Sequence, residues 1–99
     1  MKMYLISDNI DTQIGMRLAG VEGITVHEQD EAQAKLDSLC EDSEIGIILV
    51  TQTIYTLCLE HITQLKKKYK IPLITEIPDR HGIKDSEYLT HYVREAIGM

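Results

Sequence analysis

Polar and acidic residues follow two apolar segments of this chain, at positions where an α/β protein would carry its chemistry. Ser7 and Asp8 follow the first apolar run, and Thr51 follows the unbroken run IGIILV at residues 45–50. An unbroken apolar run indicates a strand buried on both faces of a parallel sheet, and such sheets bind ligands at the carboxyl ends of their strands. An acid after the first strand and a nucleophile after the third would serve Mg²⁺-dependent phosphoryl transfer.

A phosphoacceptor receiver domain is the protein class that this pattern must be tested against. It needs an Asp after the third strand and a Lys after a later strand. The third segment instead ends in Thr51, and the fourth ends in TEIP with no Lys. A hydroxyl does not replace the carboxylate that forms an aspartyl phosphate. We therefore predict no phosphorelay, expect Asp8 to cap or tether the first helix, and keep a degenerate receiver-like domain that signals by protein binding as the alternative function.

No phosphate-binding loop follows the first strand. The residues SDNIDTQIG contain neither GxGxxG nor GxxxxGK[ST], the patterns whose backbone amides enclose a phosphate. The carboxylates of Asp8 and Asp11 would repel such an anion. We therefore predict that the chain binds no nucleotide or flavin cofactor.

The histidines and cysteines lack the spacing of a metal or nucleophile site. The segment HEQDE at residues 27–31 follows the HExxH pattern only until Glu31, which stands in place of the second histidine ligand. Cys40 and Cys58 occupy apolar positions of predicted helices and form no CxxC pair, so we expect buried, reduced thiols. The other histidines are predicted to be solvated: His61, His81 and His91. We predict no catalytic residue and no metal.

The pattern of apolar residues predicts strands that alternate with helices. The strands are expected at residues 3–7, 24–27, 45–50 and 71–77, and the helices at 10–20, 30–41, 53–69 and 85–97. Four strands alternating with four helices indicate a parallel sheet with helices on both faces. We predict a small Rossmann-like or flavodoxin-like α/β sandwich with strand order 2-1-3-4 and right-handed crossovers.

Each predicted helix has one apolar face. In the first helix, Ile10, Ile14 and Leu18 recur every four residues, which predicts the packed face, and Asn9 or Asp11 is expected at the N-cap. In the third helix, four residues are predicted to point inward: Ile54, Cys58, Ile62 and Leu65. The right-handed crossovers place the second and third helices on one sheet face and the first helix on the other, where the last helix is expected to cover the bare half.

The composition is that of one soluble domain. The 99 residues are 43% hydrophobic and 26% charged, with a formal charge of −6, which argues against a nucleic-acid surface. The basic cluster at residues 66–70 falls at a predicted helix end, where cations complement the helix dipole. No segment reaches the roughly 20 apolar residues of a membrane span, so we expect a cytoplasmic protein. Residues 1–78 are predicted to form the sandwich, and residues 79–99 a hinge and a C-terminal helix.

Three segments together resemble the F subunit of V-type ATPases and A-type ATP synthases. DTQIGMRLAGV at residues 11–21 is similar to the first-helix signature of that family. IGIILVTQTI at 45–54 and IPLITEIPDRHG at 71–82 are similar to its third strand and its Pro-strand-Ile-Pro ending. Their order and spacing fit over nearly the whole chain. The residues of these motifs also have structural roles. Gly20, for example, can take the left-handed conformation at the C-terminus of the first helix.

The resemblance implies a non-catalytic component of a rotary motor. Such a protein lies in the central rotor stalk, bound to the coiled-coil shaft protein (the D subunit) inside the ring of catalytic and regulatory subunits. ATP hydrolysis or synthesis takes place in that ring and is coupled to H⁺ or Na⁺ transport through the membrane sector. The protein would then be peripheral to the membrane, with no direct insertion.

The partner-binding surface is expected on two helices. The resemblance implies that the C-terminal segment is mobile and contributes to regulation or coupling. Tyrosines on an apolar helical stripe suit a partly hydrated interface. The expected contact residues are Tyr55 and Ile62 on the third helix, and Tyr88, Leu89, Tyr92, Val93 and Ile97 on the last helix.

Overall fold

The computed structural model describes residues 2–78 of the chain. Strands and helices alternate through this part in the order β1 (Lys2–Ser7), α1 (Ile10–Leu18), β2 (Glu22–Thr25), α2 (Gln29–Cys40), β3 (Ile45–Thr51), α3 (Gln52–Leu57), α4 (Leu59–Lys68) and β4 (Leu73–Ile77). The helix and hinge predicted within residues 79–99 lie outside the described residues.

The four strands form one parallel sheet in the order β2-β1-β3-β4. The predicted α/β sandwich and its strand order are confirmed. β2 starts earlier than predicted, because Gly23 pairs with Leu5 of β1 at a point of very close approach. A Cβ atom at Gly23 would lie 2.8 Å from Leu5 Cβ and 2.9 Å from its carbonyl oxygen, so this register requires glycine.

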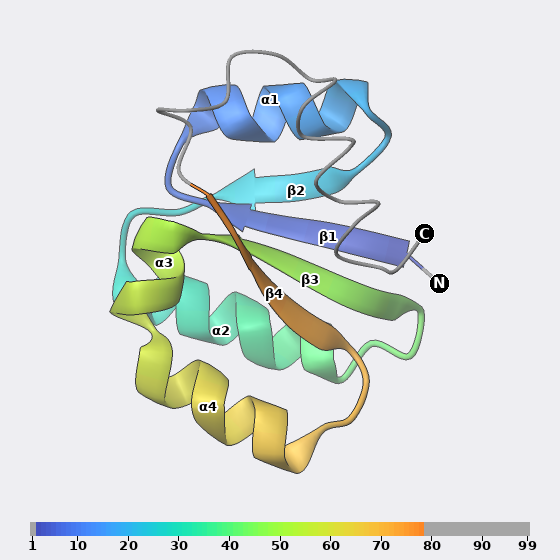
Figure 1. Cartoon of the computed structure of the whole chain (residues 1–99), viewed down its shortest axis with the longest axis vertical. Helices are drawn as coiled ribbons and strands as arrows, with labels where there is room; N and C mark the ends of the chain where they lie inside the picture. Colours follow the sequence, from blue (N-terminus) through green and yellow to red (C-terminus); the bar gives the residue numbers. More distant parts are fainter. Residues whose placement is uncertain (1, 79–99) are drawn as a thin grey trace.

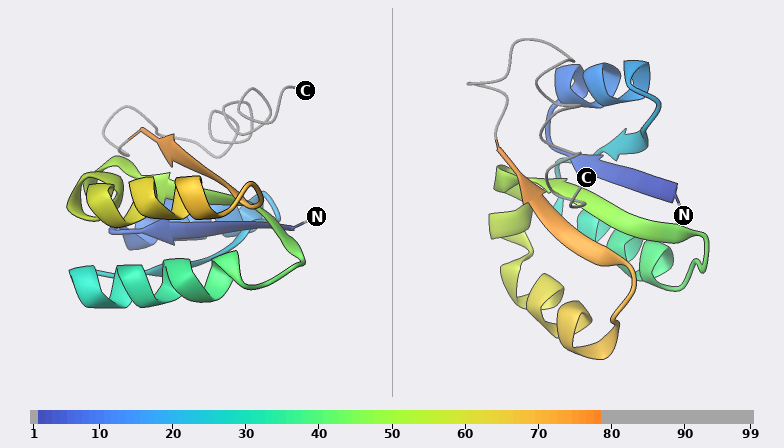
Figure 2. Two further views of the ribbon diagram at one scale, coloured as in Figure 1. Left: turned by 90° about the horizontal axis from the view of Figure 1, so that it is seen from below. Right: turned by 45° about the vertical axis from the view of Figure 1, so that its right-hand side comes forward.

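The helices cover the two faces of the sheet unequally, as the predicted crossovers required (Figure 1). On one face, side chains of α2, α3 and α4 form the larger core cluster with alternate residues of the strands. On the other face, α1 contributes Met16 to a smaller cluster with Leu5, Leu49 and Ile77. The right-hand view of Figure 2 shows α1 beside β2 and β1, away from β4. Met3 and Ile47 are only partly buried on this face.

The packed face of α1 is the opposite of the predicted one. Ile10, Ile14 and Leu18 are 54%, 51% and 78% exposed, so their stripe faces away from the sheet. Thr12 and Met16 are buried in its place. The hydroxyl of Thr12 is buried without a hydrogen-bond partner. α1 therefore turns its weaker apolar face to its own sheet and its stronger one outward.

Local signals fix both ends of α1. The Asn9 side chain accepts hydrogen bonds from the backbone N–H groups of Asp11 (2.8 Å) and Thr12 (3.3 Å), which confirms it as the N-cap. At the other end, Gly20 has φ +91°, and its N–H donates to the carbonyl of Arg17 (2.9 Å). The N–H of Val21 donates to the carbonyl of Met16 (2.9 Å). These two bonds form a Schellman C-cap and confirm the left-handed glycine.

The helix predicted at residues 53–69 is two helices. Cys58 leaves helical geometry, with φ −110° and ψ 23°, and separates α3 from α4. The Gln29 side chain of α2 donates a hydrogen bond to the carbonyl of Leu57 (3.0 Å). A side chain that takes a backbone carbonyl out of the helical ladder is a recognised cause of such a break. The four residues predicted to point inward are nevertheless all buried: Ile54, Cys58, Ile62 and Leu65.

Candidate functional site

The carboxyl edge of the sheet brings together the two residues that phosphoryl chemistry would use. The Thr51 hydroxyl donates a hydrogen bond to Asp8 Oδ1 (2.8 Å) and accepts one from the Asp8 N–H (3.3 Å). Thr51 is 1% exposed. Its hydroxyl is therefore committed to joining the ends of β1 and β3. The expectation that Asp8 caps the first helix is wrong, because Asn9 occupies the cap and Asp8 instead ties β1 to β3.

Ser7 is also committed to the backbone at this edge. Its hydroxyl donates to the carbonyl oxygen of Asn9 and accepts from the N–H of Asn9, both at 2.8 Å. The turn from β1 into α1 is thus closed by its own side chains. The described residues contain no group of three or more His, Cys, Asp or Glu side chains that would hold a metal ion. The polar groups of this edge therefore hold the sheet and α1 in position relative to each other.

His61 is not the solvated residue that was predicted. Its Nε2 lies 2.7 Å from Asp37 Oδ1, and its side chain is 25% exposed. The contact joins α4 to α2, which pack against each other on the same sheet face. His27 is exposed, and the two remaining histidines lie outside the described residues: His81 and His91. His61 therefore acts as a bridge between helices.

Both cysteines are buried, as predicted. Burial raises the pKa of the Cys58 thiol above its usual value. Burial also raises the pKa of Cys40, and the carboxylates of Asp37 and Glu41 raise it further. A thiol that stays protonated at neutral pH is a poor nucleophile and a poor metal ligand. These side chains serve the core.

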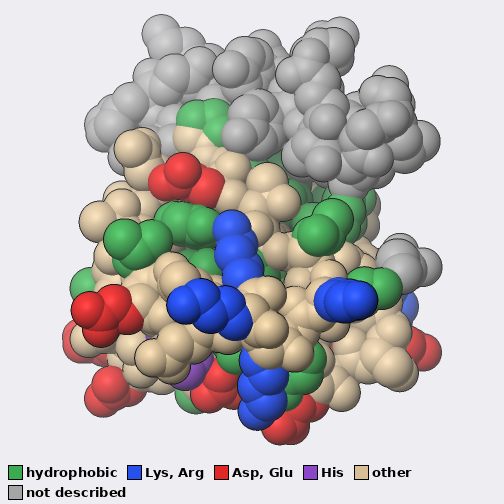
Figure 3. Space-filling model, turned by 60° about the horizontal axis from the view of Figure 1, so that its bottom comes forward, with side chains coloured by type: hydrophobic (Ala, Val, Ile, Leu, Met, Phe, Trp, Pro, Cys, Tyr) green, Lys and Arg blue, Asp and Glu red, His purple; other side chains and the backbone are tan. Residues whose placement is uncertain are grey.

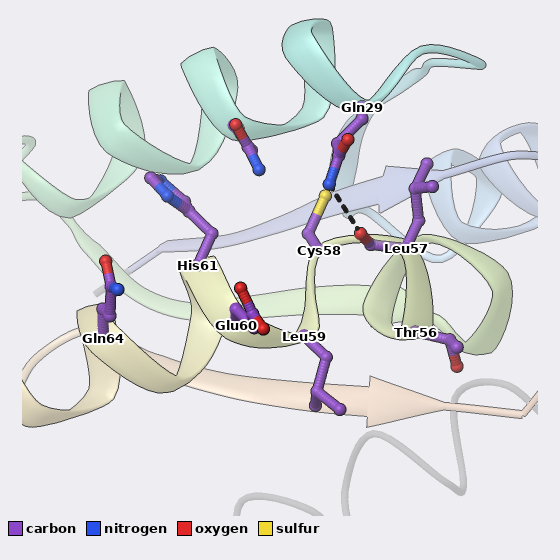
Figure 4. A pocket seen from close by; sticks show the side chains of 9 residues that line it. Gln29, Thr56, Leu57, Cys58, Leu59, Glu60, His61 and Gln64 are labelled. Atoms are coloured by element: carbon purple, nitrogen blue, oxygen red, sulfur yellow. Dashed lines mark hydrogen bonds between the residues drawn. The ribbon is translucent and has the colours of Figure 1, made fainter.

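An open groove lies between α2 and the junction of α3 and α4 (Figure 4). Its volume is about 460 Å³. The groove is lined by Gln29, Gln33, Thr56, Leu57, Cys58, Leu59, Glu60, His61 and Gln64. In this set, Gln29 is bonded to the Leu57 carbonyl and His61 to Asp37. The lining residues include the Cys58 thiol and the His61 imidazole, whose Nε2 is paired with Asp37.

The predicted partner-binding residues have different environments. Tyr55 is half-buried, and its hydroxyl accepts a hydrogen bond from Lys66 Nζ (2.8 Å). Ile62 is 0% exposed within the larger core cluster, so its side chain cannot contact a partner while this packing is kept. The other five lie outside the described residues: Tyr88, Leu89, Tyr92, Val93 and Ile97.

Three further surface residues were assigned to the core from the sequence. Ile10, Ile14 and Leu18 form a continuous outward stripe along α1, which we call the α1 stripe. A helix that presents three large aliphatic side chains to solvent is informative, because single exposed apolar residues are common and aligned ones are not. Their spacing in the sequence reveals the stripe but not the direction in which it faces.

The face of the molecule that holds α4 carries a concentration of basic side chains (Figure 3). Lys66, Lys67 and Lys68 end α4 as predicted, and Lys70 follows the helix. All four are exposed. We call these residues the basic face.

Known proteins resemble the chain over its whole length. The family model described as the ATP synthase (F/14-kDa) subunit matches residues 3–97. The chain belongs to this family. It is similar to the F subunit of the A-type ATP synthase of Pyrococcus furiosus, with 37% identity over 107 aligned residues that cover 100% of this chain and 96% of the relative. The corresponding protein of Methanothermobacter thermautotrophicus is 36% identical over 92 residues, covering 90% and 86%.

The resemblance drawn from the three sequence motifs is thereby confirmed. In this member of the family of ATP synthase F subunits, the first motif forms α1 with its Schellman cap, and the second forms β3 and enters α3. The third includes all of β4. The motifs thus build two of the four strands, β3 and β4, and nearly all of the helix on the less covered face. Within residues 2–78, no helix is long and apolar enough to cross a membrane.

Proposed function

We propose that this chain is the non-catalytic, central-stalk F subunit of a rotary V-type ATPase or A-type ATP synthase. In this role it binds the coiled-coil shaft protein, the D subunit, within the ring of catalytic and regulatory subunits. It helps to couple ATP hydrolysis or synthesis in that ring to H⁺ or Na⁺ transport. The proposal rests first on membership of the family of ATP synthase F subunits and on relatives that are named as F subunits of A-type ATP synthases.

The chemistry of the sheet edge supports a role without catalysis. Thr51 and Asp8 satisfy each other, and Ser7 is used by the turn into α1. The alternative, a degenerate receiver-like signalling domain, has no observation in its favour beyond the shared architecture. We therefore assign the chain a role in assembly and coupling.

The observation that carries shaft binding is the α1 stripe. Ile10, Ile14 and Leu18 each expose half or more of their surface, and fully burying such a side chain contributes about 1.5–3 kcal/mol. The stripe runs along one helix face at steps of four residues, the geometry with which one helix packs against another. A shaft helix with an apolar seam is the matching partner. Tyr55 and the C-terminal residues 85–97 are proposed to extend this contact.

The proposed location follows from the proposed assembly. A protein bound to the shaft inside the ring of the ATP-hydrolysing sector is peripheral to the membrane, on its cytoplasmic side. Its attachment would depend on the shaft and not on insertion into lipid.

Co-expression with the shaft protein of the same complex tests the proposal. We expect a stoichiometric complex on size exclusion and a saturable isotherm in calorimetry. Incubation of the isolated chain with acetyl phosphate and Mg²⁺ tests the receiver-like alternative, and we expect no phosphorylated product by mass spectrometry. A chain that binds no shaft protein, or that takes up phosphate, would refute the proposal.

A further inference from the structure

Charge is strongly segregated along this chain. Residues 61–75 contain Lys66, Lys67, Lys68 and Lys70 and no Asp or Glu. The chain as a whole holds 10 basic and 16 acidic residues, so the rest of it has six basic and sixteen acidic residues and a formal charge of −10. A local excess of one sign against an opposite background creates a potential that steers charged partners.

Within residues 2–78, no carboxylate pairs with the lysines of the basic face. The ion pairs within residues 2–78 are Lys2 with Glu44 and His61 with Asp37, and neither involves these lysines. Two of the four contact tyrosine rings instead. Lys66 Nζ lies 5.3 Å from the centroid of the Tyr55 ring, and Lys68 Nζ lies 5.4 Å from that of Tyr69. Such contacts orient an ammonium group and leave its charge unpaired.

The helix dipole does not account for the whole cluster. A cation in the last turn of a helix contributes about 0.3–1 kcal/mol, and the effect falls off within that turn. Lys70 lies beyond the end of α4. Four adjacent lysines without a carboxylate partner in residues 2–78 therefore indicate a use outside the folded domain.

Apolar side chains lie along the same part of the chain. Leu59 at the start of α4 and Ile71 just after Lys70 are each about half exposed. In the view of this face, hydrophobic side chains lie beside the lysines and arginines (Figure 3). A surface that combines cations with aliphatic side chains matches a protein segment with carboxylates and apolar residues better than it matches a phosphate backbone.

We propose that the basic face docks an acidic segment of a partner protein. The occupant is a helix or extended peptide that presents several Asp or Glu carboxylates next to apolar residues. A long polyanion fits less well, because a duplex or an anionic bilayer would extend past four lysines onto a body that carries ten excess negative charges. The site is separate from the α1 stripe, which is apolar and belongs to the opposite face of the sheet.

A binding assay with the full-length chain tests this assignment. The probe is a fluorescent amphipathic helical peptide with Glu on its polar face, and its control is the same peptide with Gln in place of Glu. The variant K67Q/K68Q/K70Q removes three charges and leaves the Lys66–Tyr55 contact intact. The matched variant K2Q/R17Q/K35Q removes the same number of charges elsewhere. Circular dichroism confirms that both variants fold.

We expect the Glu peptide to bind the wild-type chain, and the basic-face variant to lose about tenfold in affinity, since each exposed ion pair contributes little and three are lost. The matched variant should change by less than about threefold, and the Gln peptide should not bind. Equal losses of affinity in both variants would mean that binding depends on net charge alone, and would overturn the proposal. Tighter binding to anionic lipid vesicles or duplex DNA than to the peptide would overturn it too, and would assign the surface to that class of ligand instead.

A measurement of binding to the shaft protein distinguishes this proposal from the proposed function. K67Q/K68Q/K70Q should bind the shaft protein with unchanged affinity. If the wild-type chain fails to bind the shaft protein, the proposed function fails while the peptide result stands. If the variant loses shaft binding, the basic face is part of the shaft interface and a separate acidic partner is refuted.

Discussion

Replacing Thr51 by Val should weaken the fold by removing a side-chain link between the ends of β1 and β3. Val keeps the shape of Thr51 but neither donates to Asp8 Oδ1 (2.8 Å) nor accepts from the Asp8 N–H (3.3 Å). A hydrogen bond to a charged group contributes about 1.5–3 kcal/mol. Water reaches the partly exposed Asp8 and Val buries an added methyl group, and both offset part of the loss. We expect a net loss of about 1–2 kcal/mol in unfolding free energy.

Urea denaturation followed by circular dichroism measures this loss. The midpoint should fall with an unchanged m-value, since the surface exposed on unfolding is the same. Asp8→Asn should cost less than about 1 kcal/mol, because its amide oxygen still accepts from Thr51. Thr53→Val, at an exposed position in α3, is the matched control and should stay within about 0.5 kcal/mol of the wild type.

A double-mutant cycle decides whether the two side chains act as a pair. Thr51→Val combined with Asp8→Ala should show a coupling energy of about 1 kcal/mol. Additive losses would refute the reasoning, because they would mean that each residue stabilises the edge without the other. A Thr51→Val protein as stable as the wild type would refute it as well.

Three other predictions concern the surfaces and the close contacts of the fold. Leu18→Asp should lower the unfolding free energy by no more than about 1 kcal/mol, the cost of an anion in the last turn of a helix, and should abolish calorimetric binding to the shaft protein, whereas Met16→Ala should cost about 2–5 kcal/mol. Unchanged binding by Leu18→Asp would place the interface elsewhere. Gly23→Ala should lower the unfolding free energy by about 1–3 kcal/mol through its clash with Leu5, and an unaffected urea midpoint would contradict the observed register. Deletion of residues 80–99 should leave a cooperatively unfolding domain that binds the shaft protein more weakly, and a truncated chain that does not fold would show that these residues belong to the core.

Much of the architecture follows from local patterns in the sequence. The unbroken apolar run at residues 45–50 predicts a central strand, and β3 is the strand between β1 and β4. Asn9 and Gly20 mark the two ends of α1 because capping depends on side chains and dihedral angles within one turn. Right-handed crossovers then place the helices of each face. These features are local or follow from general rules of chirality, so one sequence is enough to predict them.

The tertiary structure alone decided which face of α1 is buried, where the third helix breaks, and which polar groups pair. Periodicity identifies the α1 stripe, but a stripe indicates equally well a core face or a face that awaits another protein, and Leu18 faces outward. Asp8 and Thr51 are 43 residues apart in the sequence, and His61 and Asp37 are 24 apart. Their pairing depends on how the fold brings together segments that are far apart in the sequence, and no local pattern encodes that arrangement.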